Sequence, residues 1–308
     1  MSTFTPLSTS QLPLTALASS RSTRLMAVVN VTPDSFSDGG GASWNLSQDH
    51  DTKPISDWLS SQLPTDTIKS NTMILDIGGQ STRPGAAEVT SEVELQRVLP
   101  FIRALRSSKP TDLSIPMTIS IDTYRAHVAA EAISAGANVV NDISGGTLDP
   151  EMLPTVVRLG CTIILMHMRG TPATMNSLTS YPDGVIPTVG RELLARVRAA
   201  EAVGIRRWRI ILDPGIGFAK TQAQNLEILR RFAELRATEG LEGIPWLVGA
   251  SRKGFIGKIT GVKEPSQRGW GTAAAVTAAV QGGADIVRVH DVKEMQQVVA
   301  MADAIWRV

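Results

Sequence analysis

The sequence predicts a (β/α)8 TIM barrel that forms a single domain. Short apolar runs that end in a polar residue, each followed by a loop and a helical stretch, recur about eight times along the chain. These runs are almost continuously apolar, as is typical of parallel strands covered on both faces. The length of 308 residues suits one such barrel. The polar strand ends of this fold meet at one rim, where active sites lie.

The composition is that of an ordinary soluble protein with a sizeable core, since 43% of the residues are hydrophobic and 19% are charged. No apolar run approaches the roughly 20 residues of a membrane span, so we expect no membrane partner. The formal net charge of +1 gives no overall field to attract nucleic acid. Any anion must therefore be bound by a local cluster. The single cysteine, Cys161, begins an apolar strand, and we interpret it as buried and unreactive.

Residues 1–24 are rich in Ser and Thr, contain two arginines and no acidic residue, and show no helical period. We interpret them as a flexible tail or interdomain linker, so that the barrel covers residues 25–308. A terminus of this composition also resembles an organelle transit peptide, although the amphipathic pattern is missing. We expect a cytoplasmic protein, with the mitochondrion as the alternative.

The first strand covers residues 25–30 and ends at Asn30, where a long glycine-rich loop begins. Loops of that length are often functional. A helix within polar sequence is expected at about residues 55–63.

The second strand, residues 73–79, carries Asp76 inside an apolar run and leads to a loop that contains Arg83. The planar guanidinium of an arginine suits an anion, because it pairs with two oxygens at once. A stray charge on a surface loop is the simpler interpretation. A helix is expected from residue 91 to about residue 106.

The third strand ends in Asp122, and a helix is expected over residues 124–136. Taken alone, this acid is better explained as a helix N-cap than as a ligand. The fourth strand carries Asn141 near its end. The fifth contains Met166 and then His167, which we interpret as a hydrogen-bonded structural group rather than a base.

A helix over residues 185–203 precedes the sixth strand, which ends in Asp213. The Pro-Gly turn that follows prevents a helix from starting at once, so an N-cap role explains this acid poorly. The seventh strand runs into Arg252 and Lys253 between small residues, which suits an anion or an electron-rich ring. A solvated basic turn is the alternative.

The alanine-rich stretch 271–284 is expected to be a helix that approaches a neighbouring helix or a second subunit closely. In the eighth strand, Arg288 and His290 share one face, as an anion site requires, and Val289 takes the other. The last helix, residues 292–308, completes the barrel.

The predicted strand-end residues form two chemical groups. One group is neutral or cationic and suits a polyanion, with an amide oxygen for Mg²⁺; it contains Asn30, Arg83, Arg288 and His290. The other offers paired donors and acceptors for the edge of a planar heterocycle; it contains Asp122, Asn141, Asp213 and Lys253. Zinc-ligand spacing, a G-x-S-x-G elbow, a P-loop and a dinucleotide fingerprint are all missing. These features predict transfer chemistry on a phosphorylated heterocycle without covalent catalysis.

Several motifs closely resemble, in order and spacing, those of the dihydropteroate synthase family of pterin-binding barrels. They are NVTPDSFSDGG, DIGGQSTRPGA, IDT, ND followed by ISGG, ILMHMRGTP, DPGIGF, SRKGFIG and RVHDV. The resemblance covers nearly everything from Leu25 to Val308. It implies that 6-hydroxymethyl-7,8-dihydropterin pyrophosphate and p-aminobenzoate are joined to give 7,8-dihydropteroate and pyrophosphate, with Mg²⁺ as cofactor.

The resemblance also implies a role for each site residue, the catalytic ones being Asp122, Asp213 and Lys253. The pterin would be bound by Asp122, Asn141, Met166, Asp213, Lys253 and Arg288. The pyrophosphate would be bound by Asn30, Arg83, Arg288 and His290, with Mg²⁺ on Asn30. The p-aminobenzoate pocket would be bordered by Phe36, Thr82, Pro84, Phe218 and Ser251.

Two positions depart from the family pattern. Gln80 stands where many bacterial relatives have Glu, which resembles eukaryotic forms, and we therefore expect further folate-pathway domains upstream. Gly254 stands where many relatives have Ser, so we expect a hydroxyl contact to the aminobenzoate carboxylate to be missing, with backbone N–H groups and Ser251 replacing it.

Two alternatives are weighed against the synthase. A pterin-dependent methyltransferase shares the barrel and the pterin-binding acids, but has no need of Arg83, Arg288 and His290 as a pyrophosphate clamp. A catalytically silent barrel that serves as a docking module should have lost strand-end residues that are all present here. By similarity to the family, we also expect a homodimer through the alanine-rich helix and the last helix.

Overall fold

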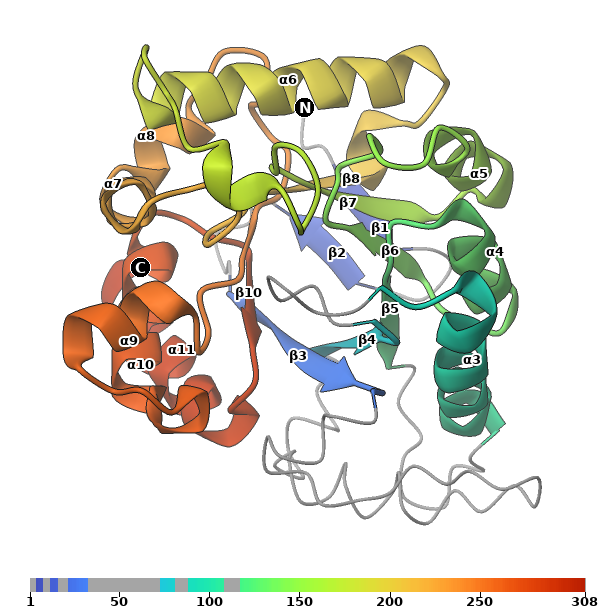
Figure 1. Ribbon diagram of the computed structural model, residues 1–308, viewed down its shortest axis with the longest axis horizontal. Helices are drawn as coiled ribbons and strands as arrows, with labels where there is room; N and C mark the ends of the chain where they lie inside the picture. The colour runs from blue at the N-terminus through green and yellow to red at the C-terminus, as the bar shows by residue number, and fades with distance from the viewer. Residues whose placement is uncertain are drawn as a thin grey trace.

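The predicted barrel forms in the computed structural model (Figure 1), which describes residues 4–7, 12–15, 22–32, 73–80, 88–107 and 117–307. Within this part of the chain, eight strands pair in parallel in the order β8-β7-β6-β5-β4-β3-β10-β9. A bridge between Leu212 and Trp246 joins the two ends of that order, so the sheet closes on itself. The strands are β3 (Arg24–Asn30), β4 (Met73–Gly78), β5 (Thr118–Asp122), β6 (Val139–Asp142), β7 (Thr162–Met166), β8 (Ile210–Asp213), β9 (Leu247–Val248) and β10 (Ile286–Val289).

The helices surround the barrel (Figure 1). They are α3 (Ser91–Ser107), α4 (Ala126–Ser134), α5 (Met152–Leu159), α6 (Val185–Ala202), α7 (Gln222–Arg230), α8 (Phe232–Arg236), α9 (Gly254–Thr260), α10 (Gly269–Gln281) and α11 (Val292–Trp306). The sequence analysis did not predict α5, α7, α8 or α9, which are short. The helix expected at residues 55–63 lies outside the described residues. None of the described helices is long and apolar enough to cross a membrane.

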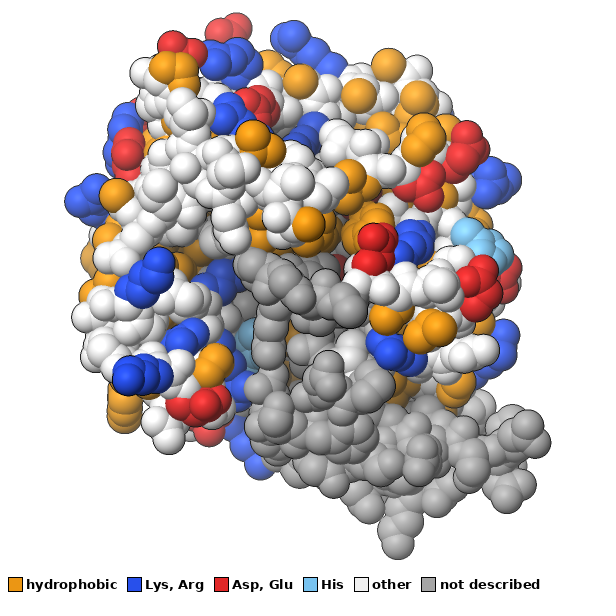
Figure 2. Space-filling view, in the orientation of Figure 1, with side chains coloured by type: hydrophobic (Ala, Val, Ile, Leu, Met, Phe, Trp, Pro, Cys, Tyr) orange, Lys and Arg blue, Asp and Glu red, His pale blue; other side chains and the backbone are white. Residues whose placement is uncertain are grey.

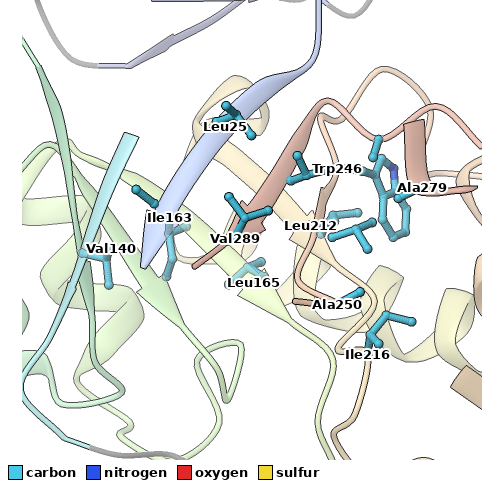
Figure 3. Packing of buried hydrophobic residues seen from close by; sticks show 14 of the residues in the cluster. Leu25, Val140, Ile163, Leu165, Leu212, Ile216, Trp246, Ala250, Ala279 and Val289 are labelled. Carbon is cyan, nitrogen blue, oxygen red and sulfur yellow. The ribbon is translucent and has the colours of Figure 1, made fainter. Parts of the chain in front are cut away.

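The core has two parts because successive strand residues point to opposite faces of the sheet. Outward-facing residues such as Leu25, Leu212 and Val289 pack against the helices (Figure 3). In this outer layer Trp246 packs edge-on against Phe232, with ring centroids 5.6 Å apart. The inward-facing residues form a separate cluster that contains no helix residue: Met26, Ile74, Val139, Ile164, Ile211, Leu247 and Ile286.

The structure overturns the N-cap interpretation of Asp122. Helix α4 begins at Ala126, and the extended Arg125 at its N-cap makes no side-chain capping bond. The backbone N–H of Ala126 donates instead to Asp149 Oδ2 at 2.7 Å. Asp122 is therefore available for another role.

A two-stranded antiparallel ribbon precedes the barrel, formed by β1 (Phe4–Leu7) and β2 (Leu12–Thr15). The sequence analysis predicted no regular structure in this segment. Strand β1 contacts the 3₁₀ turn Arg207–Arg209 that leads into β8, so the ribbon lies at the amino-terminal end of the barrel. It is thus at the opposite end from the rim that carries the polar strand ends.

Candidate active site

Four polar residues from alternate strands occupy one level inside the barrel, near its carboxyl-terminal rim. Strand tilt shifts the level by about one residue per strand. Across the sheet, Asp76 of β4 pairs with Ser120 of β5, which pairs with Val139 of β6. A shift of one residue for each of the two strands leads from Val139 to Asn141, which therefore lies level with Asp76. The same shift places Asp213 of β8 and Arg288 of β10 in the layer. Three of the predicted site residues are therefore brought together, with Asp76 as the fourth member.

Arg288 connects this layer to Asp122. Its Nε donates to Asp76 Oδ2 at 2.6 Å, and its Nη2 donates to Asp122 Oδ2 at 2.7 Å. Asn141 Nδ2 donates to the same Asp76 oxygen at 3.0 Å. Three of the predicted pterin residues, Asp122, Asn141 and Arg288, are thus linked by hydrogen bonds. Asp76, to which the sequence analysis gave no role, accepts from two of them, Asn141 and Arg288. The signal for it was an acid inside an apolar strand.

The loop after β8 brings Asp213 and Lys253 to the same place. Asp213 Oδ1 accepts a hydrogen bond from the N–H of Gly215 at 2.7 Å. Lys253 Nζ donates to the carbonyl of Ile216 and lies 4.5 Å from the centroid of the Phe218 ring. The remaining carboxylate oxygen of Asp213 makes no hydrogen bond to the described residues. It and the other Lys253 hydrogens are available to a ligand.

Burial sets the ionisation of this site. It raises the pKa of Asp122 to about 7, although Arg288 opposes the shift, and Asp76 adds to it. It lowers the pKa of Lys253 to about 8, against the attraction of Asp213. Burial also raises the pKa of Asp213, while Lys253 pulls it down. Burial therefore disfavours the charged forms of Asp122, Asp213 and Lys253, and perturbed pKa values of this kind are common at functional sites.

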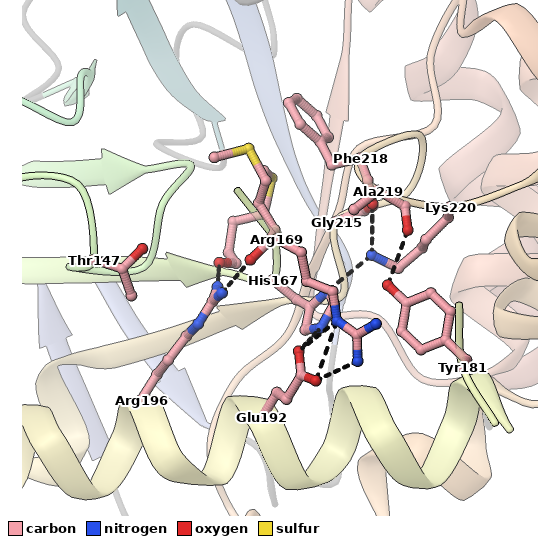
Figure 4. Close-up of polar contacts among 12 residues, drawn as sticks. Thr147, His167, Arg169, Tyr181, Glu192, Arg196, Gly215, Phe218, Ala219 and Lys220 are labelled. Carbon is pink, nitrogen blue, oxygen red and sulfur yellow. Dashed lines mark hydrogen bonds and ion pairs between the residues drawn. The ribbon is translucent and has the colours of Figure 1, made fainter. Parts of the chain in front are cut away.

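His167 is structural, as predicted. It is fully buried, and its Nε2 lies 2.8 Å from Glu192 Oε2 on α6 while its Nδ1 lies 2.9 Å from Lys220 Nζ. Burial, together with the nearby Lys220, lowers the pKa of its imidazole to about 3. Figure 4 shows this network beside α6, together with Arg169 and Tyr181. The buried Cys161 also fits its prediction, because burial raises its pKa to about 11.

Lys220 is a residue that the sequence analysis missed. It is 8% exposed, and besides His167 its Nζ binds the carbonyls of Gly215 at 3.0 Å and Phe218 at 2.9 Å. Three acceptors thus saturate its three hydrogens. Tyr181 adds a bond from its hydroxyl to the carbonyl of Ala219 at 2.9 Å. Lys220 therefore stabilises the loop that carries Phe218 and follows Asp213.

The turn after β9 places Ser251 and Lys253 on the rim. Arg252 between them has a φ of 59°, which is unusual for a residue with a side chain. Its N–H donates to Thr272 Oγ1 at 3.1 Å, and its guanidinium pairs with Asp291. These contacts stabilise a strained backbone.

Ser251 is contacted by the predicted pyrophosphate residue His290, whose N–H donates to Ser251 Oγ at 3.2 Å and whose Nδ1 lies 3.0 Å away. One residue predicted for the aminobenzoate pocket and one predicted for the pyrophosphate are therefore in contact here. The face of the molecule in Figure 2 is hollowed beside β10, and cationic and His side chains lie in this hollow.

Other predicted residues fall into three groups. Met166 and Phe218 belong to one apolar cluster at the rim, with Ile143, Met168, Met175 and Ala219. The half-buried Asn30 ends β3, and its side chain makes no hydrogen bond to the described residues. Four predicted residues lie outside the described residues: Phe36, Thr82, Arg83 and Pro84. Gln80 lies just before the latter three and binds Tyr124 and Arg125 after β5.

A family model described as pterin binding enzyme matches residues 26–290. The chain belongs to this family. It is 48% identical to the dihydropteroate synthase of Synechocystis over 92% of this chain and 91% of that protein. It is similar in structure to the dihydropteroate synthase of Xanthomonas albilineans solved with 4-aminobenzoic acid, with a TM-score of 0.80, 35% identity and complete coverage of both chains.

A second relative is much longer than this chain. The chain is 48% identical to the folic acid synthesis protein fol1 of Pneumocystis carinii over 92% of its own length. It spans only 36% of that fungal protein.

Proposed function

We propose that the chain is a dihydropteroate synthase. It would join 6-hydroxymethyl-7,8-dihydropterin pyrophosphate to p-aminobenzoate and release pyrophosphate. The observation that carries the proposal is the group of facing acids, amide and lysine at the rim, with Asp122, Asn141, Asp213 and Lys253 all offering unused polar atoms. A planar heterocycle with donors and acceptors along one edge needs such a site. The relatives named synthases cover almost all of the chain, which supports the same conclusion.

The reaction would proceed by departure of pyrophosphate followed by attack of the amine. The bond between the pterin methylene carbon and oxygen breaks, and its electron pair leaves with the pyrophosphate. Positive charge then develops on the pterin, and the carboxylates of Asp122 and Asp213 stabilise it in a site with little water. The aniline nitrogen attacks this carbon and then loses a proton. Because the electrophile is strong, no strong base is needed.

The anion would be bound by cationic side chains and by Mg²⁺. Asn30 fits a metal ligand because its amide is not hydrogen-bonded to the described residues, and Mg²⁺ commonly uses one or two protein oxygens with substrate phosphates. Among the described residues, no cluster of three His, Cys, Asp or Glu side chains could hold a metal alone. When bound, Mg²⁺ would neutralise charge on the phosphates. His290 and Arg288 are assigned to the same anion, with Arg83.

The aminobenzoate would lie between Phe218 and Ser251. Phe218 stands beside Lys253, and Ser251 contacts His290, so both flank the pterin and anion positions. Phe36, Thr82 and Pro84 are assigned to the same pocket. Ser251 would supply the hydroxyl contact to the aminobenzoate carboxylate.

Pyrophosphate release tests the proposal. The pterin pyrophosphate is incubated with Mg²⁺, with and without p-aminobenzoate, using the wild type and Lys253→Ala. Release that depends on the amine and falls at least about a hundred-fold in the variant is expected, because a cationic donor is lost from a buried site. A folded wild type that binds the pterin but releases no pyrophosphate would instead support a methyltransferase or a silent barrel.

The proposal also covers the oligomeric state of the protein, its domain composition and its cellular location. A homodimer through α10 and α11 is proposed, as are further folate-pathway domains in the whole protein, in line with the long fungal relative. The cytoplasm is the proposed location, with the mitochondrion as the alternative.

A further inference from the structure

Asp76 is an acidic residue at a buried position, where an acid is expected to destabilise the fold. It lies in the middle of β4 with no exposed surface, on the same face as Ile74 of the inner barrel cluster. Its Oδ1 is buried and has no hydrogen-bond partner among the described residues. A buried carboxylate with an unpaired oxygen costs free energy. We therefore expect Asp76 to have a function at the candidate active site, which lies at the rim of the barrel.

The contacts of Asp76 define the orientation of the Asn141 amide. Its Oδ2 accepts the Nε hydrogen of Arg288 at 2.6 Å, within an ion pair. The same oxygen accepts a hydrogen bond from Nδ2 of Asn141 at 3.0 Å. The NH₂ group of Asn141 therefore faces Asp76.

This orientation decides what Asn141 offers to a ligand. With its Nδ2 on Asp76, its Oδ1 is left as an acceptor that makes no hydrogen bond to the described residues. Arg288 is oriented in the same way, since its Nε is held by Asp76 and its Nη2 by Asp122. Its Nη1 remains for a ligand. One carboxylate thus sets the direction of two side chains from two other strands.

We propose that Asp76 is a positioning residue for heterocycle recognition, which fixes the Asn141 amide with its oxygen toward the pterin and directs the Arg288 guanidinium. The assignment rests on the proposed function, because it takes the ligand to be a pterin. Asp76 itself does not touch the substrate. Its effect is exerted through Asn141 and Arg288, and so it should disappear in part when Asn141 is removed.

A double-mutant cycle on equilibrium binding of the pterin substrate analogue 6-hydroxymethylpterin tests this. The variants are Asp76→Ala, Asn141→Ala and the double variant. Asp76→Thr is added because threonine is close in size to aspartate and favours strands, which guards against a variant that fails to fold. Ser120→Ala is the matched control, since Ser120 pairs with Asp76 in the register, is equally buried and has an unpaired hydroxyl.

Both Asp76 variants should bind the pterin about ten-fold or more weakly, the cost of hydrogen bonds to a charged group. In the Asn141→Ala background the added loss should be about three-fold or less, because coupled residues are not additive. Ser120→Ala should bind like the wild type. The assignment would be overturned if the loss of pterin affinity in the double variant equalled the product of the two single losses. An Asp76→Thr variant with wild-type affinity would also overturn it. A wild type that binds no pterin would instead overturn the proposed function beneath it.

Discussion

Asp122 and Lys253 are ionisable groups whose pKa values move toward each other. Burial raises the pKa of Asp122 to about 7 and lowers that of Lys253 to about 8. The proposed chemistry needs the ionised acid as counter-charge and the protonated lysine as donor. Both forms coexist only within a narrow pH range, because the fraction of ionised Asp122 rises with pH while that of protonated Lys253 falls.

The pH profile of kcat/KM for the pterin substrate should therefore be bell-shaped, with limbs near pH 7 and pH 8. At pH 5 the activity should be about a hundred-fold below its limit, since two pH units below a pKa leave about one carboxyl in a hundred ionised. Steady-state assays from pH 5 to pH 10 measure this. The Asp122→Asn variant should lose the acid limb and keep the basic one. An unchanged acid limb in that variant would contradict the assignment.

Gly254 offers room for a side chain with a hydroxyl group. It is the first residue of α9, and a Cβ built there meets no atom within 4 Å. Gly254→Ser should lower the KM for p-aminobenzoate about ten-fold or more, the value of one added hydrogen bond to a charged group. Gly269→Ser is the control, because Gly269 begins α10 and is equally unobstructed. An effect of the same size in both variants would argue against a specific contact.

The sequence identified the chemical type of the site residues but not their partners. Asp122, Asn141, Asp213 and Lys253 were found because parallel strand ends share one rim. The bonds of Arg288 join residues 212 and 166 positions apart, and no local pattern reports which acid an arginine will reach. Asp122 was better explained as a helix cap until the start of α4 was known.

The loop between β8 and α7 is organised by one buried amine. Gly215 has a φ of 67°, and a Cβ there would lie 1.9 Å from the carbonyl oxygen of His167, so only glycine fits. Ala219 also has a positive φ, of 49°. Lys220 compensates for this strained path by binding two loop carbonyls and His167.

Replacing Lys220 by methionine should therefore weaken both the loop and the site. Three acceptors would lose their donor, which should lower the free energy of unfolding by about 2 kcal/mol or more. Pterin affinity should fall about ten-fold because Asp213 and Phe218 lose their support. Denaturant unfolding and equilibrium binding measure the two effects. The control is Lys258→Met, because Lys258 is an exposed residue of α9. A Lys220→Met variant that behaves like this control would contradict the account.

At the level of elements, the long periodic helices and the eight strands were predictable, whereas the short helices were not. Helix α7 begins with a capping box at Thr221 and Gln224, a local signal that was present in the sequence and was not used. Helix α5 has eight residues and α9 seven, too short for a clear helical period. Packing against the barrel stabilises such helices more than their own propensity does.

The whole molecule leaves large apolar side chains exposed on neighbouring helices at one side. Trp270 on α10 is 91% exposed, and Met301 on α11 is 63% exposed. Ile305 and Trp306 are each 47% exposed near the end of α11. The sequence left two roles open for the alanine-rich helix, packing in the core and contact with a second subunit. In the structure two of its alanines, Ala275 and Ala279, are buried in the core, whereas Ala274 and larger side chains of α10 and α11 are exposed.

These exposed residues would form the interface of the proposed homodimer. A charged side chain introduced among them should dissociate the dimer. Met301→Glu should reduce the mass in light scattering from that of a dimer to that of one 32.9 kDa chain, because an interface core excludes unpaired charge. Val203→Glu is the matched control: Val203 is 44% exposed but lies at the end of α6, away from α10 and α11. A wild type with the mass of one chain would exclude the dimer, and dissociation by both variants would place the contact elsewhere. Because the rim residues come from one barrel, a dissociated but folded Met301→Glu chain should retain pterin binding.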